Sequence, residues 1–263
     1  MRYHSTVGLT PAQTSELIAR AWQVHDGRPP AERENFTMPF GRAVVMVLIM
    51  ARHNLRQQMT ADLYETSQPT VSRIWRYLIA LLGQVTALDR KHLAQALKIG
   101  VVLIDGTPIP TGNRAGTGTT NFNGKHRKQA LNIQVAARLG GALVGVSRPV
   151  RGSRHDSRAL EEVGWADQIT TARAGNELLA VFADSAYVKH TRLTPRPKKK
   201  DEPRTEADRE WNRKIASMRA PVERTIAHLK QWKILSTGYR GRLSELPSVI
   251  HAITNLEFYR QSP

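Results

Sequence analysis

The sequence predicts an α/β protein in which a mixed β-sheet flanked by helices follows an all-helical N-terminal segment. Apolar residues recur at helical spacing through the first hundred residues, with helix caps between them. From residue 99 the pattern changes to short aliphatic runs separated by glycine-rich or charged turns, with helical stretches between the later runs. We therefore expect a helical domain over 1–98 and a second domain over 99–263.

The N-terminal segment begins with a helix signal. Thr10 is of the residue type that caps a helix N-terminus, and Pro11 is tolerated at the first helical position. A second helix is expected over 39–53, and short helices are expected to begin at Thr60 and at Ser67.

The second domain should contain several strands with helices between them. Each expected strand is rich in aliphatic residues and is bounded by turn residues. The predicted strands cover 101–104, 131–137, 142–146 and 178–183, and the predicted helices cover about 157–163 and 209–232.

Composition restricts the class of protein. The net charge of +17 favours polyanionic partners, although a ribosome-associated or merely basic protein would share it. The absence of cysteine excludes disulfides, thiolate zinc sites and cysteine nucleophiles. The longest apolar run, 43–51, is far shorter than the ~20 residues that span a bilayer, and the N-terminus lacks the apolar core of a signal peptide. We therefore expect a cytoplasmic protein with no membrane partner.

Residues 60–78 have the pattern of a helix-turn-helix, which is a DNA-binding motif. An apolar stripe follows the second helix at Val71, Ile74, Trp75 and Leu78. The opposite face carries residue types that contact phosphates and base edges, namely Gln68, Thr70, Ser72, Arg73 and Arg76. An ordinary helical hairpin with a solvated face would show the same stripe, but the tight turn favours DNA binding.

Three carboxylates are candidates for a metal site. Asp105 and Asp184 each follow an apolar run, and the carboxyl end of a strand is where a sheet presents side chains to a ligand. Glu223 lies in a basic helix between Arg219 and Lys230. Carboxylate oxygens suit Mg²⁺ or Mn²⁺, and pairs of such ions cut phosphodiesters. The alternatives are aspartates that serve turns and a surface salt-bridge ladder on the helix.

Pro221 makes the start of this helix ambiguous. A proline either kinks a helix or occupies its first turn. If the helix began at Pro221, Arg219 would lie outside it and would not share a face with Glu223.

Five short motifs occur in an order that is more specific than any one of them. They are Ile104-Asp105-Gly106-Thr107-Pro108-Ile109, residues 126–135, residues 152–156, Ala183-Asp184-Ser185-Ala186-Tyr187 and residues 222–235. On these motifs the chain resembles, over about 40–260, bacterial insertion-sequence transposases of the DDE superfamily endonuclease type. The resemblance implies an N-terminal DNA-binding domain with a helix-turn-helix near 60–80, and an RNase H-like DDE catalytic domain over 99–263.

The resemblance also implies roles for individual residues. Asp105, Asp184 and Glu223 match the catalytic triad, which is expected to bind two Mg²⁺ or Mn²⁺ ions. Arg219 and Lys230 match the basic positions that accompany the glutamate, and we expect them to contact DNA.

Further positions are expected to assist. His155 and Asp156 match a recurrent pair near the active site, although by themselves they are typical of a helix cap. The group often has tyrosine where this chain has Ala216. Basic loop residues should follow the phosphate backbone, although a solvated charge run is more common; they are Lys125, His126, Arg127, Lys128 and residues 198–200.

The implied function is DNA transposition. The protein would cut the ends of an insertion element in double-stranded DNA and join them to target DNA, as a homodimer or larger assembly in the prokaryotic nucleoid. A domesticated DNA-binding protein without catalysis, and a metal-dependent endonuclease without strand transfer, remain as alternatives. A transcriptional regulator would account only for the first hundred residues.

Overall fold

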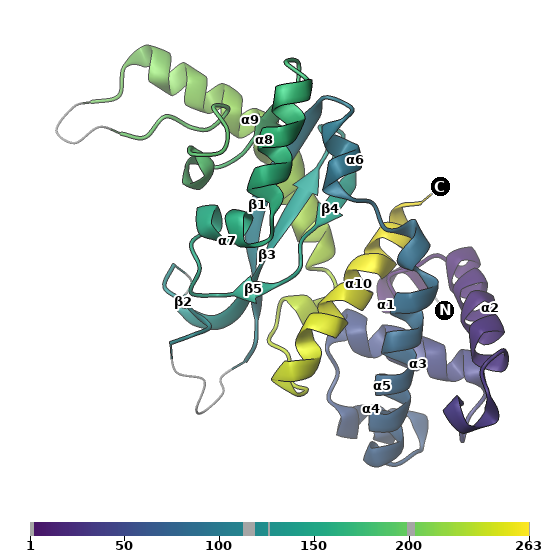
Figure 1. The fold of residues 1–263 in the computed structure, drawn as a ribbon. Helices are drawn as coiled ribbons and strands as arrows, with labels where there is room; N and C mark the ends of the chain where they lie inside the picture. The colour runs from purple at the N-terminus through teal and green to yellow at the C-terminus, as the bar shows by residue number, and fades with distance from the viewer. Residues whose placement is uncertain (1–2, 113–118, 126, 199–202, 263) are drawn as a thin grey trace. The chain divides into compact units, whose positions relative to one another are not determined.

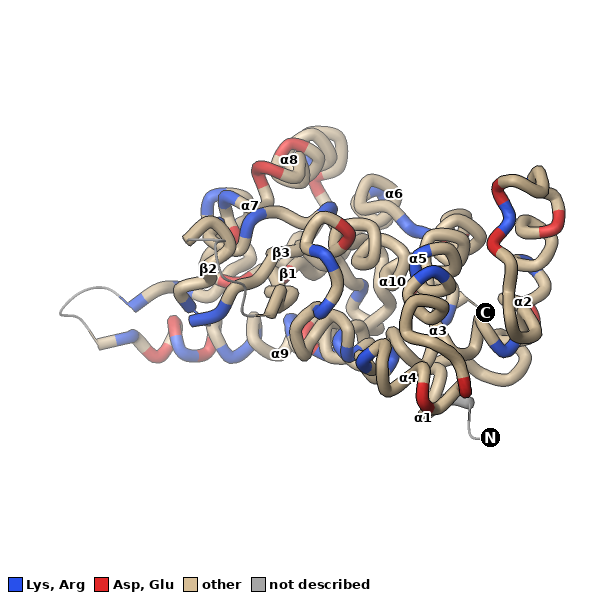
Figure 2. The backbone as a smooth tube through the Cα atoms, turned by 90° about the horizontal axis from the view of Figure 1, so that it is seen from below, with Lys and Arg blue, Asp and Glu red and all other residues tan. Residues whose placement is uncertain are grey.

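The computed structural model describes residues 3–112, 119–125, 127–198 and 203–262 (Figure 1). By their contacts the residues form two compact units, Met1–Arg90 together with Leu229–Pro263, and Lys91–His228. The sequence pattern predicts one domain over 99–263, whereas the residues from Leu229 onward group by their contacts with the N-terminal helices. Lys and Arg residues occur in both units (Figure 2).

The first unit is helical. Its elements are α1 (Tyr3–Thr6), α2 (Pro11–Asp26), η1 (Pro30–Glu32), α3 (Phe40–His53), α4 (Gln57–Tyr64), α5 (Gln68–Val85), η2 (Ala87–Asp89), η4 (Lys233–Leu235), η5 (Leu243–Glu245) and α10 (Leu246–Gln261), where η marks a 3₁₀ helix. The predicted cap at Thr10 is confirmed. Its hydroxyl accepts the Gln13 N–H at 3.2 Å, and the Gln13 side chain accepts the Thr10 N–H at 3.1 Å.

A three-residue turn, 65–67, joins α4 to α5. α4 begins before Thr60, and α5 is much longer than the short helix expected there. Glu65 ends α4 in the left-handed region (φ 53°), and the Ser67 hydroxyl caps α5 by accepting the Thr70 N–H at 3.3 Å. All four residues of the predicted apolar stripe on α5 are buried, which confirms that part of the pattern.

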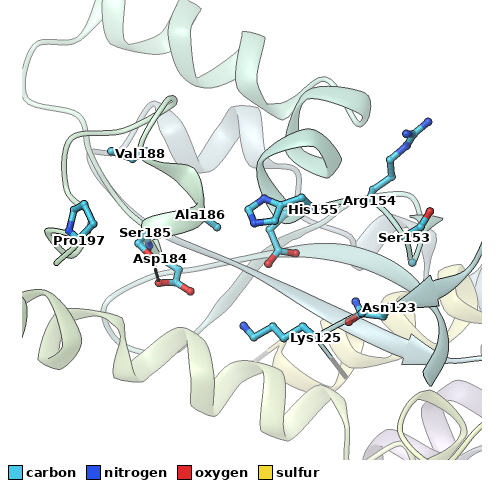
Figure 3. A pocket seen from close by; sticks show the side chains of 13 residues that line it. Asn123, Lys125, Ser153, Arg154, His155, Asp184, Ser185, Ala186, Val188 and Pro197 are labelled. Carbon is cyan, nitrogen blue, oxygen red and sulfur yellow. Dashed lines mark hydrogen bonds between the residues drawn. The ribbon is translucent and has the colours of Figure 1, made fainter. Parts of the chain in front are cut away.

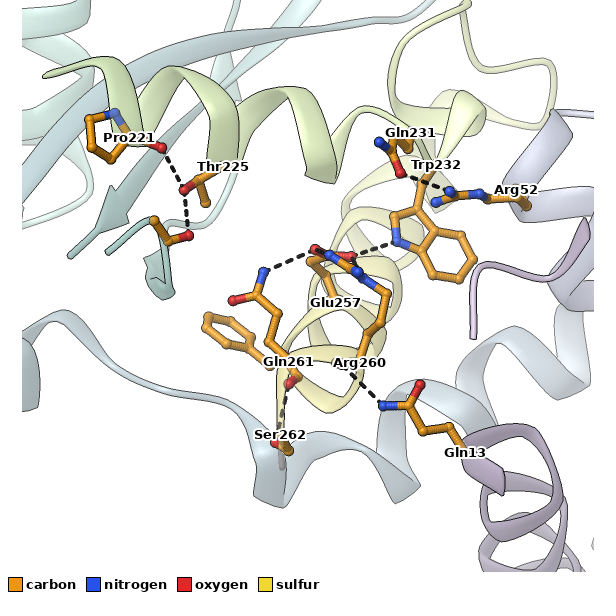
Figure 4. A network of polar contacts seen from close by, with 12 residues as sticks. Gln13, Arg52, Pro221, Thr225, Gln231, Trp232, Glu257, Arg260, Gln261 and Ser262 are labelled. Atoms are coloured by element: carbon orange, nitrogen blue, oxygen red, sulfur yellow. Dashed lines mark hydrogen bonds and ion pairs between the residues drawn. The ribbon is translucent and has the colours of Figure 1, made fainter. Parts of the chain in front are cut away.

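α10 packs against α5 and was not among the predicted helices. A Cβ added at Gly83 of α5 would lie 2.9 Å from the Ala252 Cβ of α10, so the two helices are in close contact. α10 also buries the Glu257 carboxylate, which accepts hydrogen bonds from Trp232 (3.0 Å) and Arg260 (2.6 and 2.9 Å) (Figure 4). A buried charge is tolerated only when it is paired in this way.

The second unit is a mixed sheet with helices. Its elements are α6 (Leu93–Leu97), β1 (Val101–Pro110), β2 (Phe122–Asn123), β3 (Lys128–Ala137), β4 (Leu143–Val146), β5 (Val150–Arg151), α7 (Asp156–Glu162), α8 (Trp165–Gly175), β6 (Ala180–Phe182), η3 (Ser185–Tyr187) and α9 (Glu206–Leu229). β1 pairs antiparallel with β3 and parallel with β6, while β2, β4 and β5 pair with β3. In the described part of the chain these six strands form the predicted mixed sheet.

The four predicted strands are present with other bounds: β3 begins three residues earlier than predicted, β4 begins one residue later, and β1 and β6 differ most. β1 continues to Pro110, so Asp105 lies within the strand rather than at its end. The reason is that β3 pairs with β1 as far as Pro110, beyond the point where β6 stops at Leu103. β6 is shorter than predicted, because Leu178 lies before it and is 88% exposed. The sequence analysis did not predict α8.

Helices cover both faces of the sheet. α6, α7 and α8 bury apolar residues against one face, where alternate β1 residues such as Val102 and Ile104 join their core. α9 runs along the opposite face, as the two views in Figures 1 and 2 agree. Because successive side chains of a strand point to opposite faces, Leu103 and Asp105 point toward the α9 side.

α9 is one continuous helix with Pro221 inside it. Arg219 and Glu223 therefore lie one turn apart on the same helix face, which resolves the ambiguity that Pro221 created. α9 ends at Leu229, so Lys230 lies one residue beyond a helix that was predicted to continue to 232. At 24 residues α9 is the longest helix described, yet no helix in the described ranges is long and apolar enough to cross a membrane.

The contact between α5 and α10 generates a stability prediction. Gly83→Ala should lower the free energy of unfolding, because overpacking costs about 1–3 kcal/mol while alanine contributes only ~1 kcal/mol to a helix. Chemical denaturation measures the change. Gly41→Ala in α3 is the matched control, since its Cβ would meet Ile18 at an ordinary 3.6 Å. The Gly41→Ala protein should be as stable as wild type or more stable. If Gly83→Ala is as stable as Gly41→Ala, that result contradicts the close packing of α5 and α10.

Candidate active site

The Arg219 guanidinium lies among the three candidate carboxylates. Its Nη2 atom is 3.3 Å from Asp105 Oδ2 and 4.0 Å from Glu223 Oε1, and its Nη1 atom is 3.9 Å from Asp184 Oδ1. The structure therefore brings the three acids together around one cation, although they are far apart in the sequence. Their catalytic roles remain predictions.

Each acid reaches this point from a different element. Asp105 points from β1 toward α9, and the Gly106 N–H donates to its Oδ1 at 2.9 Å. Asp184 follows β6 and accepts the Ser185 N–H at the start of η3. Because β6 runs parallel to β1, Asp184 emerges beside Asp105. Glu223, on α9, has a side chain that is 60% exposed.

The buried position of Asp105 changes its electrostatics. Burial raises the pKa of Asp105 from 3.8 to about 6, while the nearby Arg219 cation and the Gly106 N–H act in the opposite direction. The charges of Asp184 and Asp156 add to the increase. Asp105 therefore loses its proton only near neutral pH unless a further cation arrives.

The donor set suits a hard divalent cation, because all three side chains offer carboxylate oxygens. Among the residues that the structure describes, no group of three His, Asp or Glu side chains is already arranged to hold a metal ion. Arg219 is instead the shared cation, and within that same part of the chain its buried Nε atom has no hydrogen-bond partner. Asp105, Asp184 and Glu223 are the residues that would hold a metal.

Comparison with known proteins identifies the family. The DDE superfamily endonuclease family matches residues 104–257, a range that contains all three acids. The chain belongs to this family. A protein of Streptomyces albus G named "Putative transposase for insertion sequence element IS112" is 30% identical over 236 residues, which are 87% of this chain and 83% of that protein. No solved structure matches the chain significantly.

A chain of buried polar side chains supports β1 of this DDE endonuclease on the face opposite α9. The Tyr187 hydroxyl donates to Gln134 (2.7 Å), Gln134 donates to Asn132 (3.3 Å), and Asn132 donates to Asp156 Oδ1 (2.8 Å). Gly106 leaves room for this chain, since a Cβ there would lie 2.4 Å from Asp156 Oδ1. The network ties β3, η3 and α7 to the strand that carries Asp105.

The network assigns a position to the pair whose role the sequence left open. Asp156 begins α7 and bonds to Asn132, and it is not one of the acids that share Arg219. His155 is at the N-cap position, but its side chain makes no capping hydrogen bond. His155 therefore occupies the position of a helix cap, but its side chain does not cap the helix.

Sequence reasoning missed Asn132, Gln134 and Tyr187. Asn132 and Gln134 are two residues apart within an apolar strand, so their amide side chains point to the same face. This spacing was a sequence signal for a buried polar site. Their partners come from distant segments. Burial also raises the pKa of the Tyr187 hydroxyl well above its usual value, which keeps it a hydrogen-bond donor.

The predicted contacts on α5 divide into two groups. Thr70 is buried and bonds to the Ser67 hydroxyl at 2.9 Å, so its placement on the solvent face was wrong. The reason is that the third residue of a capped helix turns back toward the cap. Arg73 and Arg76 are exposed as expected, Ser72 and Gln68 are partly exposed, and Arg73 lies 3.5 Å from Glu34.

The predicted basic loop contacts lie at the β2–β3 turn and before α9. Lys125, Arg127 and Lys128 are exposed, and Arg127 adopts the left-handed conformation (φ 50°). His126, Lys199 and Lys200 lie outside the described residues.

The pKa of Asp105 generates a pH prediction for the metal-free protein. Since this pKa is higher in the folded state, about 6 against 3.8, the protonated group stabilises the fold at low pH. That contribution is lost as the pH rises through about 6. Wild type loses this contribution between pH 5 and pH 7.5, whereas Asp105→Asn has none to lose. The difference in unfolding free energy between the two proteins should therefore shift by about 1 kcal/mol in favour of Asp105→Asn.

Urea denaturation of both proteins at the two pH values measures this difference. Asp167→Asn, at an exposed position of α8, is the control and should follow wild type. If the difference between Asp105→Asn and wild type is the same at both pH values, Asp105 has no raised pKa.

Proposed function

We propose that this DDE endonuclease is a DNA transposase that cuts the ends of an insertion element and joins them to target DNA with divalent metal ions. The observation that carries the proposal is the convergence of Asp105, Asp184 and Glu223 on one cation, Arg219. Acids from three elements repel one another unless a cation lies between them, and metal-held carboxylates are the usual apparatus for cutting phosphodiesters. The name of the Streptomyces relative favours a transposase over other nucleases of the family.

The residues of the site would have different roles. Asp105, Asp184 and Glu223 would hold two Mg²⁺ or Mn²⁺ ions, whose chemistry is to activate the attacking oxygen and to stabilise the leaving 3′ oxygen. The Gly106 N–H holds one oxygen of Asp105, which leaves Oδ2 directed at the shared cation. Arg219 balances the charge of the acids and would meet the phosphate group of the DNA.

The fold proposal follows from the sheet. A mixed sheet in which β1 pairs antiparallel with β3 and parallel with β6, with helices on both faces, supports an RNase H-like catalytic domain within 99–263.

The DNA-reading proposal concerns the first unit. We propose that α4, the turn 65–67 and α5 form a helix-turn-helix in an N-terminal domain over 1–98. Gln68, Ser72, Arg73 and Arg76 would face the DNA. Arg73 is exposed and lies 3.5 Å from Glu34, which is a long ion pair, so Arg73 can exchange it for a phosphate. Because transposition brings two DNA ends together, the active form would be a homodimer or a larger assembly.

The three acids generate a catalytic prediction. Asp105→Asn, Asp184→Asn and Glu223→Gln should each reduce cutting about a thousandfold or more, since metal ions supply several kcal/mol of transition-state stabilisation. DNA binding should persist. Gel assays on DNA that flanks the gene, with Mg²⁺ or Mn²⁺, measure both properties, with Asp167→Asn as the control.

The products of this assay separate the alternatives. Metal-dependent cuts followed by joined products support a transposase. Cuts without joining indicate an endonuclease, and specific binding without cuts indicates a domesticated protein. Full cutting by any one of the three variants removes that residue from the active site.

Metal binding generates a prediction with a readout other than activity. Mn²⁺ at about 100 times its Kd should raise the Tm of the wild type by about 5–10 °C, because a ligand that binds only the folded state stabilises it. Asp105→Asn should lose most of this increase, whereas Asp167→Asn should keep it. Differential scanning calorimetry measures the shift, and an unchanged wild-type Tm would contradict a metal site.

A further inference from the structure

A pocket of about 620 Å³ lies beside Asp184 (Figure 3). Its lining includes Lys125 from the β2–β3 turn, His155 and Asp156 at the start of α7, and Val188 after η3. This volume is within the range of pockets that hold a single small organic group. Because Asp184 also lies 3.9 Å from Arg219, an occupant of the pocket would be next to the acids.

The lining of the pocket is mixed in chemistry. The lining combines the charged or polar residues Lys125, His155 and Asp184 with the apolar residues Ala186 and Val188. Val188 is 58% exposed, so its side chain is accessible to a molecule in the pocket. The pocket therefore suits a ligand that is anionic at one end and apolar at the other.

Some of the charged groups in the pocket are available to a ligand and others are engaged. Neither the Lys125 nor the His155 side chain makes a hydrogen bond or ion pair with any residue that the structure describes. Arg154, in contrast, lies 3.2 Å from Glu162, and its side chain points away from the pocket (Figure 3). Asp156 is held by Asn132. Among the described residues that line the pocket, Lys125 is therefore the cation whose side chain is available to a phosphate.

We propose that this pocket binds one unpaired nucleotide of the DNA strand being cut, with its phosphate near Lys125 and its base against Val188. The proposal rests on the proposed function, because it places that nucleotide next to the phosphodiester at Asp184. A nucleotide combines an anionic phosphate with a flat, largely apolar base, which matches a lining that contains both a free lysine and apolar side chains. A stacked and paired base cannot enter a pocket, so the nucleotide must lie outside the duplex.

The experiment compares three 20-base-pair duplexes of one sequence by fluorescence anisotropy in Ca²⁺ buffer. The first is blunt, the second carries one unpaired 3′ nucleotide, and the third carries the same overhang without its base. The unpaired nucleotide should improve the Kd of the wild type about fivefold over the abasic overhang, a low value for base contacts because the residues that line the pocket include no Phe, Tyr or Trp. The abasic overhang isolates the contribution of the base.

Two variants locate the effect. Val188→Ala should reduce the advantage of the base to less than about twofold, because it removes the apolar surface. Lys125→Gln should weaken binding of both overhangs, because it removes a phosphate contact. Leu178→Ala and Lys98→Gln are the controls, since both residues are exposed and neither lines the pocket. These controls should keep the wild-type ratio.

The outcomes distinguish this proposal from the proposed function. Equal affinity of the wild type for the two overhangs, or a full advantage of the base in Val188→Ala, overturns the pocket proposal even if the protein cuts DNA. A base advantage that depends on Val188 supports it even if cutting is absent. Failure of the wild type to bind any of the duplexes overturns both proposals.

Discussion

The pairing of Arg219 with Asp105 determines how the second unit is organised. The Arg219 side chain is 11% exposed, and a guanidinium this deeply buried is costly unless acids compensate for its lost hydration. The acids in turn need the cation, because three carboxylates within reach of one group would otherwise repel one another. β1, the turn after β6 and α9 are thereby held to a common point. Asp105 is the most buried of the three acids, and it contacts Arg219 most closely.

The two faces of β1 have separate tasks. Asp105 points toward α9 and the shared cation, whereas the next residue, Gly106, faces the polar chain that runs from Tyr187 to Asp156. Successive side chains of a strand point to opposite faces. Neighbouring positions of β1 can therefore face the shared cation on one side and the supporting hydrogen-bond network on the other. The support is made of hydrogen bonds whose partners are buried, and such networks hold a single geometry because an unpaired member is costly. The negative charge of Asp156 nevertheless acts across the strand, where it contributes to the raised pKa of Asp105.

Sequence patterns predicted local features well and long-range ones poorly. The cap at Thr10, the cap at Ser67 and the buried stripe of α5 depend on neighbours within about one helical turn, and all three were predicted. The predicted extent of β1 was wrong, because antiparallel pairing with β3, in which Pro110 meets Ala130, decides where the strand ends. α10 was missed because it is buried along most of its length, so it shows little of the alternation between apolar and polar faces that marks a surface helix.

By itself the sequence determined which chemical groups the protein has and roughly which elements carry them. Asp105, Asp184 and Glu223 could be selected as candidates because they stand in apolar or basic settings that single them out. Only the tertiary structure decided that Arg219 is the cation they share, that Asp156 belongs to the supporting network, and that Val188 and Lys125 face one pocket. The physical reason is that these relations arise from strand pairing and helix packing between distant segments, whereas a sequence pattern records only the neighbours that a residue has along the chain.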